Sequence, residues 1–166
     1  MRYLTSLLTS EYKKEAFYCG KDLLDNYIHN QASQDLKRKL AVCFVLPEKD
    51  NSLKGYYTLS NASIPQDQLP DTIKKIMPKG YLNLPTTLLG RLAVDLKHQR
   101  NGIGELLLVD ALKRSFDVSA ENIGSMAVIV DPIDDDAVRF YKKYGFILLP
   151  GNGKMFIPMK TIKELF

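Results

Sequence analysis

The stretch that decides the fold is LLGRLAVDLKHQRNGIGELLLVDALKR, which runs from Leu88 to Arg114. Residues 88–94 form a compact apolar run, broken only by one glycine and one arginine, and predict a buried strand. A polar, basic segment follows, and a helix is predicted from Gly102. Its apolar residues recur at helical spacing and predict packing on more than one side; they are Ile103, Leu106, Leu107, Leu108, Ala111 and Leu112.

Two glycines, Gly102 and Gly104, stand at the start of this helix. Glycine lets a ligand approach the backbone closely, and the first turn of a helix offers free N–H groups with about half a positive charge. Together these features predict an anion site, most naturally for phosphate. A Rossmann fingerprint would need glycine where Leu107 stands, and no Gly-Lys-Ser/Thr of a P-loop occurs. The alternative is that the glycines only form a turn.

Composition bounds the class of protein. A chain of 166 residues with 45% hydrophobic and 25% charged residues suits one globular domain, 1–166. The net charge of +4 permits a polyanionic partner without requiring one. Two distant cysteines, Cys19 and Cys43, and two histidines give no metal-binding pattern, so no metal is expected. No transmembrane-length apolar run or signal peptide is recognisable, so a cytoplasmic protein without membrane attachment is expected.

The remaining pattern predicts alternating strands and helices. A helix capped by Asp22 should carry Leu23, Leu24, Tyr27, Ile28, Ala32 and Leu36 on its inner side, and a short helical turn is expected in 11–17. Further helices are expected at 71–76 and at 135–143, the latter capped by Asp134 and ended by Gly145. Strands are expected at 2–8, 41–46, 55–60, 126–130, 146–149 and 155–159. The sum is an α/β (α+β) domain with a mixed, mostly antiparallel sheet flanked by helices.

Three consecutive cations, Lys37, Arg38 and Lys39, end the first long helix. They have two interpretations that the sequence leaves open. Cations at a helix C-terminus complement the dipole. They are also suited to contacting the phosphates of a nucleic acid.

Two motifs together resemble those of the GNAT acetyltransferases. The segment 99–104, Gln-Arg-Asn-Gly-Ile-Gly, resembles the family's Gln/Arg-x-x-Gly-x-Gly/Ala signature, which holds the pyrophosphate of acetyl-CoA. The segment 134–141, followed by Gly145-Phe146, resembles the later Asn-x-x-Ala-x-x-Phe/Leu-Tyr signature. It departs at Asp134, where asparagine is commoner, and an added carboxylate there would weaken a contact with CoA.

The GNAT resemblance implies a set of site residues. The donor, acetyl-CoA, would lie along a strand edge whose backbone pairs with the pantetheine arm, and against the glycine loop. The implied cofactor-binding residues are Leu92, Ala93, Val94, Gln99, Arg100, Asn101, Gly102, Ile103, Gly104 and Asp134. Tyr141 is the implied catalytic residue, the acid that protonates the departing thiolate. The alternative is that Tyr141 only packs beside Phe140.

The resemblance narrows further to the GNAT toxins of bacterial type II toxin–antitoxin systems. It rests on Cys19-Gly20, Leu24-Asp25-x-Tyr27, Gln31-Ala32-x-Gln34-Asp35 with Arg38, Gly55-Tyr56-Tyr57-Thr58-Leu59-Ser60 and Leu89-Gly90-Arg91-Leu92-Ala93-Val94-Asp95. That family acetylates the α-amino group of aminoacyl-tRNA and so stops translation. A ribbon-helix-helix antitoxin neutralises it, and related toxins are often homodimers. The candidate tRNA contacts are Lys37, Arg38, Lys39 and Arg91.

The acceptor amine offers a chemical check on this interpretation. No carboxylate lies within residues 88–94 to act as a base. An α-amine has a pKa of about 7.7–8.0, against about 10.4 for lysine, so an α-amine tolerates a site without a strong base. Two other classes remain open: an N-acetyltransferase for a small amine or a protein N-terminus, and a non-catalytic module that binds acyl-CoA or protein.

Overall fold

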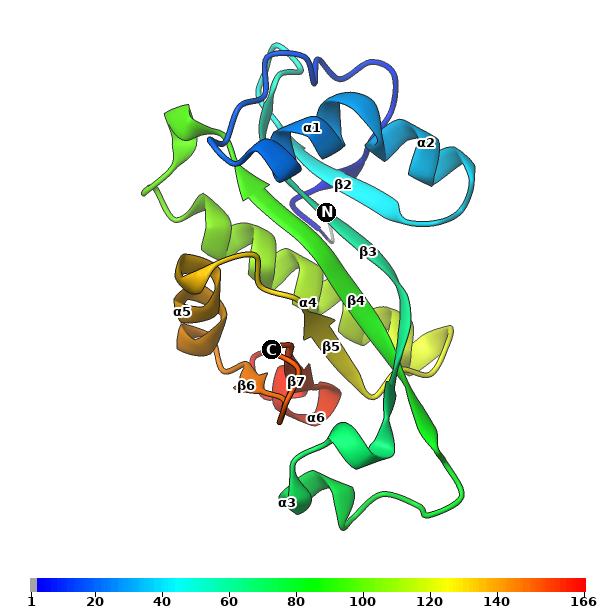
Figure 1. Ribbon diagram of the computed structural model, residues 1–166. Coiled ribbons are helices and arrows are strands. Elements are labelled where there is room, and N and C mark those ends of the chain that lie inside the picture. The colour runs from blue at the N-terminus through cyan, green and yellow to red at the C-terminus, as the bar shows by residue number, and fades with distance from the viewer. Residues whose placement is uncertain (1–2) are drawn as a thin grey trace. The chain divides into compact units, whose positions relative to one another are not determined.

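The computed structural model describes residues 3–166, and within this range seven strands form one mixed sheet (Figure 1). The strands lie in the order β1-β2-β3-β4-β5-β7-β6. Their bounds are β1 Ser6–Leu7, β2 Val42–Pro47, β3 Leu53–Pro65, β4 Asn83–Val94, β5 Ala127–Val130, β6 Ile147–Leu148 and β7 Met155–Pro158. β4 and β5 pair in parallel, whereas β1–β2, β2–β3, β5–β7 and β6–β7 are antiparallel. The predicted mixed, mostly antiparallel sheet is therefore confirmed.

Helices flank the strands as the sequence predicted. They are α1 Asp22–Asn30, α2 Ala32–Lys37, α3 Asp71–Lys74, α4 Ile103–Glu121, α5 Asp135–Lys143 and α6 Met159–Lys163, with single 3₁₀ turns η1 Gln66–Gln68 and η2 Leu96–His98. The described chain groups into two compact units. The first contains the residues up to Ser60 together with Leu89–Arg114, and the second contains Asn61–Leu88 and Ser115–Phe166. The expectation of one domain over 1–166 stays a prediction.

In the first unit, helices pack against strand β3 through residues that alternate along it. Tyr56 is buried with Tyr27 and Ile28 of α1, and its ring lies 6.3 Å from that of Tyr27. The next residue, Tyr57, donates a hydrogen bond from its hydroxyl to Asp110 of α4, at 2.8 Å. Successive strand side chains point to opposite faces. The paired tyrosines therefore fix α1 and α4 on the two faces of this part of the sheet.

Gly55 sets how closely α4 approaches that sheet. A Cβ atom at this position would lie 2.6 Å from Cδ1 of Leu107 and 2.8 Å from the carbonyl oxygen of Ala93. Neither distance is compatible with a methyl group. The glycine is therefore required by close packing of the helix that begins at the proposed anion site.

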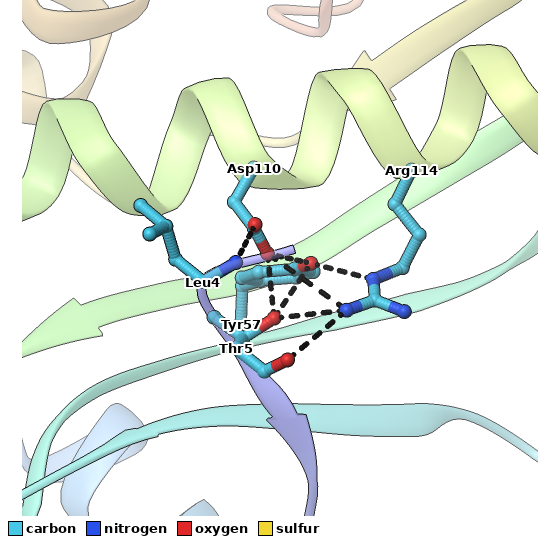
Figure 2. Close-up of polar contacts among 5 residues, drawn as sticks. All are labelled: Leu4, Thr5, Tyr57, Asp110 and Arg114. Carbon is cyan, nitrogen blue, oxygen red and sulfur yellow. Dashed lines mark hydrogen bonds and ion pairs between the residues drawn. The ribbon is translucent and has the colours of Figure 1, made fainter. Parts of the chain in front are cut away.

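A buried polar network holds the N-terminal segment to α4 (Figure 2). One carboxylate oxygen of Asp110 accepts the Leu4 N–H at 2.7 Å, and the other accepts the hydroxyls of Thr5 and Tyr57 at 2.5 and 2.8 Å. Arg114 completes it by donating to the hydroxyls of Tyr57 and Thr5 and to the Thr5 carbonyl. Its guanidinium also lies 3.8 Å from the ring centroid of Phe44. Buried charge is tolerated here because the carboxylate and the guanidinium are both hydrogen-bonded within the network.

The second unit has its own apolar core. It gathers buried residues from β3, β4, β5 and β7 and from the connections between them: Ile64, Leu69, Leu84, Ala127, Ile129, Leu149 and Phe156. All four residues of β5 are buried, as expected for a strand with neighbours on both sides. Helix α5 ends where predicted, because Gly145 takes φ +96, a conformation that favours glycine.

Several local predictions were wrong. The helix predicted from Asp22 is two helices, since Gln31 has φ −125 and breaks the hydrogen-bonded ladder. Asp22 is the first residue of α1 and not its cap; Lys21 stands at the cap position, without a side-chain cap hydrogen bond. Leu23 was expected inside but is 74% exposed, because a side chain in the first turn points past the helix start. Leu106 is 44% exposed, so the packed face of α4 is narrower than predicted. Residues 11–17 form turns and one isolated bridge instead of a helical turn.

Strand lengths also differed from the prediction. β3 and β4 extend well beyond 55–60 and 88–94, because polar residues at their outer ends still pair with neighbouring strands. β1 is limited to Ser6–Leu7, and the predicted first residue of that strand, Arg2, lies outside the described residues. α6 had not been predicted; it follows Pro158, whose fixed φ suits the residue before a helix.

Candidate active site

The first unit contains the end of β4 and the loop that leads into α4. Asp95 follows the strand directly and is buried. One of its carboxylate oxygens accepts the Lys97 N–H at 2.9 Å, and the other accepts the Tyr18 N–H at 3.1 Å. Because both oxygens are engaged by backbone amides, Asp95 fixes the loop and is not a free general base.

Gln99, predicted as a cofactor-binding residue, turns its side chain back onto the protein. Its amide nitrogen donates to the carbonyl oxygens of Val94, at 2.8 Å, and Cys19, at 3.0 Å. The side chain therefore ties the loop to the end of β4 and to the segment before α1. This is a positioning contact, through which the first residue of the motif sets the course of the residues that follow.

The loop then passes through two residues in the left-handed region. Arg100 has φ +65 and Gly102 has φ +77. For a residue with a side chain this conformation costs about 1–2 kcal/mol, and such strain is found where backbone must be presented to a ligand. No heavy atom lies within 4 Å of the position that a Cβ on Gly102 would take. The loop thus leaves open space at the glycine immediately before α4.

Helix α4 begins at Ile103, one residue after the predicted start at Gly102. Its first recorded ladder bond joins the Leu106 N–H to the Gly102 carbonyl at 3.1 Å. Helix geometry leaves the N–H groups before Leu106 without intrahelical acceptors, which creates positive potential at this end. Gly104 lies within that first turn, so its small size keeps the backbone accessible.

Asp134 and Tyr141 belong to the second unit. Asp134 precedes the first residue of α5, and Tyr141 lies in the last turn of that helix. The Asp134 carboxylate accepts the Ala137 N–H at 2.8 Å, which confirms the predicted cap. An aspartate performs this role as well as the asparagine that is commoner in the motif. Its predicted contact with CoA stays a prediction.

Tyr141 is only 7% exposed, and its ring contacts those of Phe140 and Phe146, with centroids 5.3 and 5.1 Å away. Burial raises the pKa of Tyr141 above the ordinary value of a phenol. The phenol is therefore protonated at neutral pH, as an unperturbed tyrosine also is. Packing and proton donation are compatible, since the rings fix the orientation of the phenol.

The candidate tRNA contacts lie in the first unit. The guanidinium of Arg91 lies 3.6 Å from the centroid of the Tyr27 ring, and the Tyr27 hydroxyl donates to Asp35 of α2 at 2.9 Å. Lys37, Arg38 and Lys39 are exposed at the end of that helix. Tyr27 thereby joins Arg91 to the helix that carries the three cations.

The described residues were also compared with the requirements of a cysteine nucleophile, a metal site and a membrane-spanning helix. Burial raises the pKa of the Cys19 thiol to about 11 and that of Cys43 to about 12, so neither supplies a thiolate nucleophile at neutral pH. Within residues 3–166, no three histidine, cysteine or acidic side chains gather as a metal site would need. Over the same residues no helix combines the length and apolar character that crossing a membrane requires.

Sequence reasoning missed the residues that support the loop. Asp95 and the Tyr18–Gly20 segment hold it in place, together with Asp25, which accepts the N–H groups of Cys19 and Gly20 at 2.7 and 3.3 Å. An aspartate directly after an apolar run is a recognised signal for a side-chain-to-backbone turn. That signal identifies Asp95 as a turn residue, but the partner segment lies far away in the chain.

A glycine-containing loop at the start of α4, a mixed sheet and a buried tyrosine on the capped helix α5 are the features expected of an acetyl-CoA-dependent acetyltransferase. The family model of the acetyltransferase (GNAT) domain matches residues 77–162 of this chain. The chain belongs to the GNAT acetyltransferase family, and the resemblance drawn from the two motifs is confirmed.

Two relatives are similar over most of the chain. A tRNA-acetylating toxin of Mycobacterium tuberculosis (strain ATCC 25618 / H37Rv) is 33% identical over 135 residues, which cover 81% of this chain and 78% of the toxin. A probable toxin TacT of Sinorhizobium fredii (strain NBRC 101917 / NGR234) is 28% identical over 173 residues, which cover 99% and 94%.

Solved structures of this group share the fold. A tyrosine-to-phenylalanine mutant of KacT has a TM-score of 0.91 at 27% identity and covers all of both chains. AtaT complexed with acetyl-methionyl-tRNAfMet has a TM-score of 0.89 at 28% identity and covers 98% of each. A mutant AtaT toxin bound to the C-terminus of the antitoxin AtaR and to acetyl-CoA has a TM-score of 0.82 at 26% identity and covers 100% and 99%.

Proposed function

We propose that this chain is the toxin of a type II toxin–antitoxin system, which transfers acetyl from acetyl-CoA to the α-amino group of aminoacyl-tRNA and thereby blocks translation. The observation that carries the proposal is the 33% identity, over 81% of the chain, to a tRNA-acetylating toxin. The similarity to AtaT in complex with acetyl-methionyl-tRNAfMet supports the same substrate.

The loop at the start of α4 would hold the donor. Backbone N–H groups around Gly102 and Gly104 would face the pyrophosphate, and the Arg100 guanidinium would pair with a phosphate oxygen. Leu92, Ala93 and Val94 would offer strand backbone to the amides of the pantetheine arm. The parallel register with β5 involves Thr87 and Leu88, so these three residues lie beyond it along β4. Asn101 and Ile103 would contribute through the backbone of the same loop.

The Tyr141 phenol would supply the proton that the reaction needs at sulfur. Attack of a neutral α-amine on the thioester carbonyl forms a C–N bond, and collapse of the tetrahedral intermediate breaks the C–S bond. The phenol donates its proton to the departing thiolate and recovers one from the nitrogen, so the products are an amide and free CoA thiol. Burial makes this phenol a weaker acid than an ordinary tyrosine, so the proton moves as the C–S bond breaks and negative charge develops on sulfur.

The acceptor would be positioned by basic residues of the first unit. Lys37, Arg38 and Lys39 would contact phosphates, and Arg91, stacked on Tyr27, would present its charge in a fixed orientation. An α-amine is partly neutral at cellular pH, so it can react without a strong base. The buried, doubly hydrogen-bonded Asp95 fits such a site.

The partner that controls the toxin would be an antitoxin of the ribbon-helix-helix type. The complex of mutant AtaT with the C-terminus of AtaR supports a toxin–antitoxin pair. An acidic or amphipathic tail would suit a chain of net charge +4. The toxin would act in the cytoplasm, where charged tRNA is found, and would form a homodimer as related toxins often do.

The direct test is to incubate the protein with acetyl-CoA and bulk charged tRNA and to analyse the aminoacyl ends by mass spectrometry. The expected product is N-acetylated aminoacyl-tRNA. If acetyl-CoA is consumed only with small amines or peptide N-termini, the chain is an acetyltransferase of the alternative class. If acetyl-CoA binds without turnover, the chain is a binding module.

Growth provides a second, independent test. Expression of this chain alone should arrest growth, and coexpression with the neighbouring antitoxin gene should relieve the arrest. Normal growth with abundant, active and unpartnered protein would contradict the toxin assignment while leaving the acetyltransferase chemistry intact.

A further inference from the structure

The connection between β3 and β4 is an ordered excursion of the second unit, residues 66–82, which contains η1 and α3 (Figure 1). Gln66 closes it. Its backbone N–H donates to the Leu82 carbonyl at 2.8 Å, and its side-chain amide donates to the carbonyls of Pro78 and Tyr81 at 2.9 and 2.8 Å. This one residue therefore holds three points of the excursion, one through its backbone and two through its side chain.

The excursion borders an open hollow of about 390 Å³. Its lining includes Gln66, Asp67, Lys74, Lys79, Tyr81 and Asn83. The volume falls within the range of about 300–1,000 Å³ that is common for small-molecule sites. The lining also includes Pro65 and Leu82, so apolar surface lies beside amide, ammonium and phenol groups that can hydrogen-bond to a heterocyclic base.

Positive charge gathers at the hollow and beside it. Lys74, Lys75 and Lys79 are exposed, and none of them forms an ion pair within the described part of the chain. Two carboxylates lie on the same excursion, Asp67 in the lining and Asp71 in the first turn of α3. An acidic side chain accepts hydrogen bonds from base amino groups, whereas the lysines are left to meet phosphates.

An aromatic side chain completes the pattern. Tyr81 lines the hollow and is 58% exposed, and Leu82 beside it is 79% exposed. Exposed aromatic rings next to cations are the usual means of holding unpaired nucleotides, because the ring stacks on a base while the cations contact the backbone. The carboxylates of an acidic peptide would pair with the lysines but would offer no flat base to the exposed Tyr81 ring.

We propose that this excursion is an RNA-binding subsite, in which Tyr81 stacks on an unpaired base of the tRNA and Lys74 and Lys79 contact the adjacent phosphates. The inference rests on the proposed function, since it assigns a second contact surface for the same RNA substrate. It adds a surface from the second unit to the basic residues of the first unit.

The test uses the full chain and measures tRNA affinity, its dependence on salt, and the KM for charged tRNA. Tyr81→Ala should weaken tRNA binding by about 5–150-fold, the range observed when a stacking aromatic is removed. Tyr81→Phe keeps the ring and should bind nearly as the parent does. Lys74→Ala with Lys79→Ala should flatten the slope of log K against log salt by about 1.4–1.8.

Matched controls separate a defined subsite from general basicity. Lys160→Ala with Lys163→Ala removes two exposed lysines of α6 in the same unit and should leave tRNA affinity close to that of the parent. The affinity for acetyl-CoA should be unchanged in every variant. A raised KM for charged tRNA, with unchanged turnover of a small aminoacyl ester, is the expected kinetic pattern.

Results that contradict these expectations distinguish a failure of the RNA-binding subsite from a failure of the proposed function. If the parent acetylates charged tRNA but Tyr81→Ala and the lysine pair bind it normally, the subsite is overturned and the proposed function stands. If those variants lose binding to the antitoxin instead, the surface belongs to a protein partner and the RNA assignment is overturned. If the parent neither binds nor acetylates charged tRNA, both proposals are overturned together.

Discussion

The side-chain amide nitrogen of Gln99 lies 2.8 Å from the carbonyl oxygen of Val94. This contact joins the last residue of β4 to the first residue of the glycine motif. The Gln99 side chain therefore contributes to the site by holding the loop in shape. Contact with the ligand is left to the loop residues that follow it.

Gln99→Ala should therefore lower both stability and affinity for the donor. Two hydrogen bonds are lost, each contributing about 1 kcal/mol to the free energy of unfolding. We expect acetyl-CoA affinity, measured by calorimetry, to fall about tenfold because the loop is no longer held in its binding shape. Gln34→Ala, at an exposed position on α2, is the control and should change neither quantity. Parent-like acetyl-CoA affinity in Gln99→Ala would contradict the supporting role.

Arg100→Gly should affect stability and ligand affinity in different directions. Glycine adopts φ +65 without strain, so the melting temperature should not fall. Loss of the guanidinium removes a charged hydrogen bond of about 1.5–3 kcal/mol, so acetyl-CoA should bind at least tenfold more weakly.

Asn51→Gly provides the matched control for Arg100, because Asn51 has φ +70 in a turn between β2 and β3. That variant should also fold well, with unchanged acetyl-CoA affinity. If Arg100→Gly bound acetyl-CoA as tightly as the parent, the Arg100 guanidinium would not be a contact of the donor.

Tyr141→Phe keeps the buried ring and removes the proton donor. A positioned general acid contributes about 10²–10⁴-fold in rate, so kcat should fall within that range. Acetyl-CoA affinity and melting temperature should stay near those of the parent, and growth arrest should be lost. Tyr144→Phe, on the same stretch of chain, is the control and should remain active and toxic. Full activity in Tyr141→Phe would show that Tyr141 is a packing residue and not the proton donor.

Replacement of Lys37, Arg38 and Lys39 by alanine tests the two interpretations of this cluster. If all three contact phosphates, tRNA binding should weaken and the slope of log K against log salt should flatten by about 2–2.7. The control replaces Lys154, Lys160 and Lys163, which carry the same total charge. An unchanged tRNA affinity, accompanied by a lower melting temperature, would assign the cluster to compensation of the α2 dipole.

Asp110→Ala tests the buried network of the first unit. It leaves the Leu4 N–H, two hydroxyls and the Arg114 guanidinium without their shared acceptor, and we expect a loss of about 3–5 kcal/mol in the free energy of unfolding. Denaturant titration measures it. Glu121→Ala, at the exposed end of the same helix, should stay within about 0.5 kcal/mol of the parent. Equal stability of the two variants would contradict the anchoring role.

The sequence by itself determined the features that depend on neighbours in the chain. The alternation of Tyr56 and Tyr57, the start of α4 at the glycines, the Asp134 cap and the end of α5 at Gly145 all follow from spacing or local backbone chemistry. The two motifs also identified the family, because each specifies a loop and a helix start in a fixed order.

Only the tertiary structure decided how distant segments hold the site. It brings the Cys19 carbonyl to Gln99, the Tyr18 N–H to Asp95, and Thr5 to Asp110 and Arg114. It also closes the excursion through Gln66. Hydrogen-bonding groups find partners by position in space, and sequence spacing carries no information about a partner that lies tens of residues away. Local rules therefore predicted the elements, while long-range contacts set the geometry of the site.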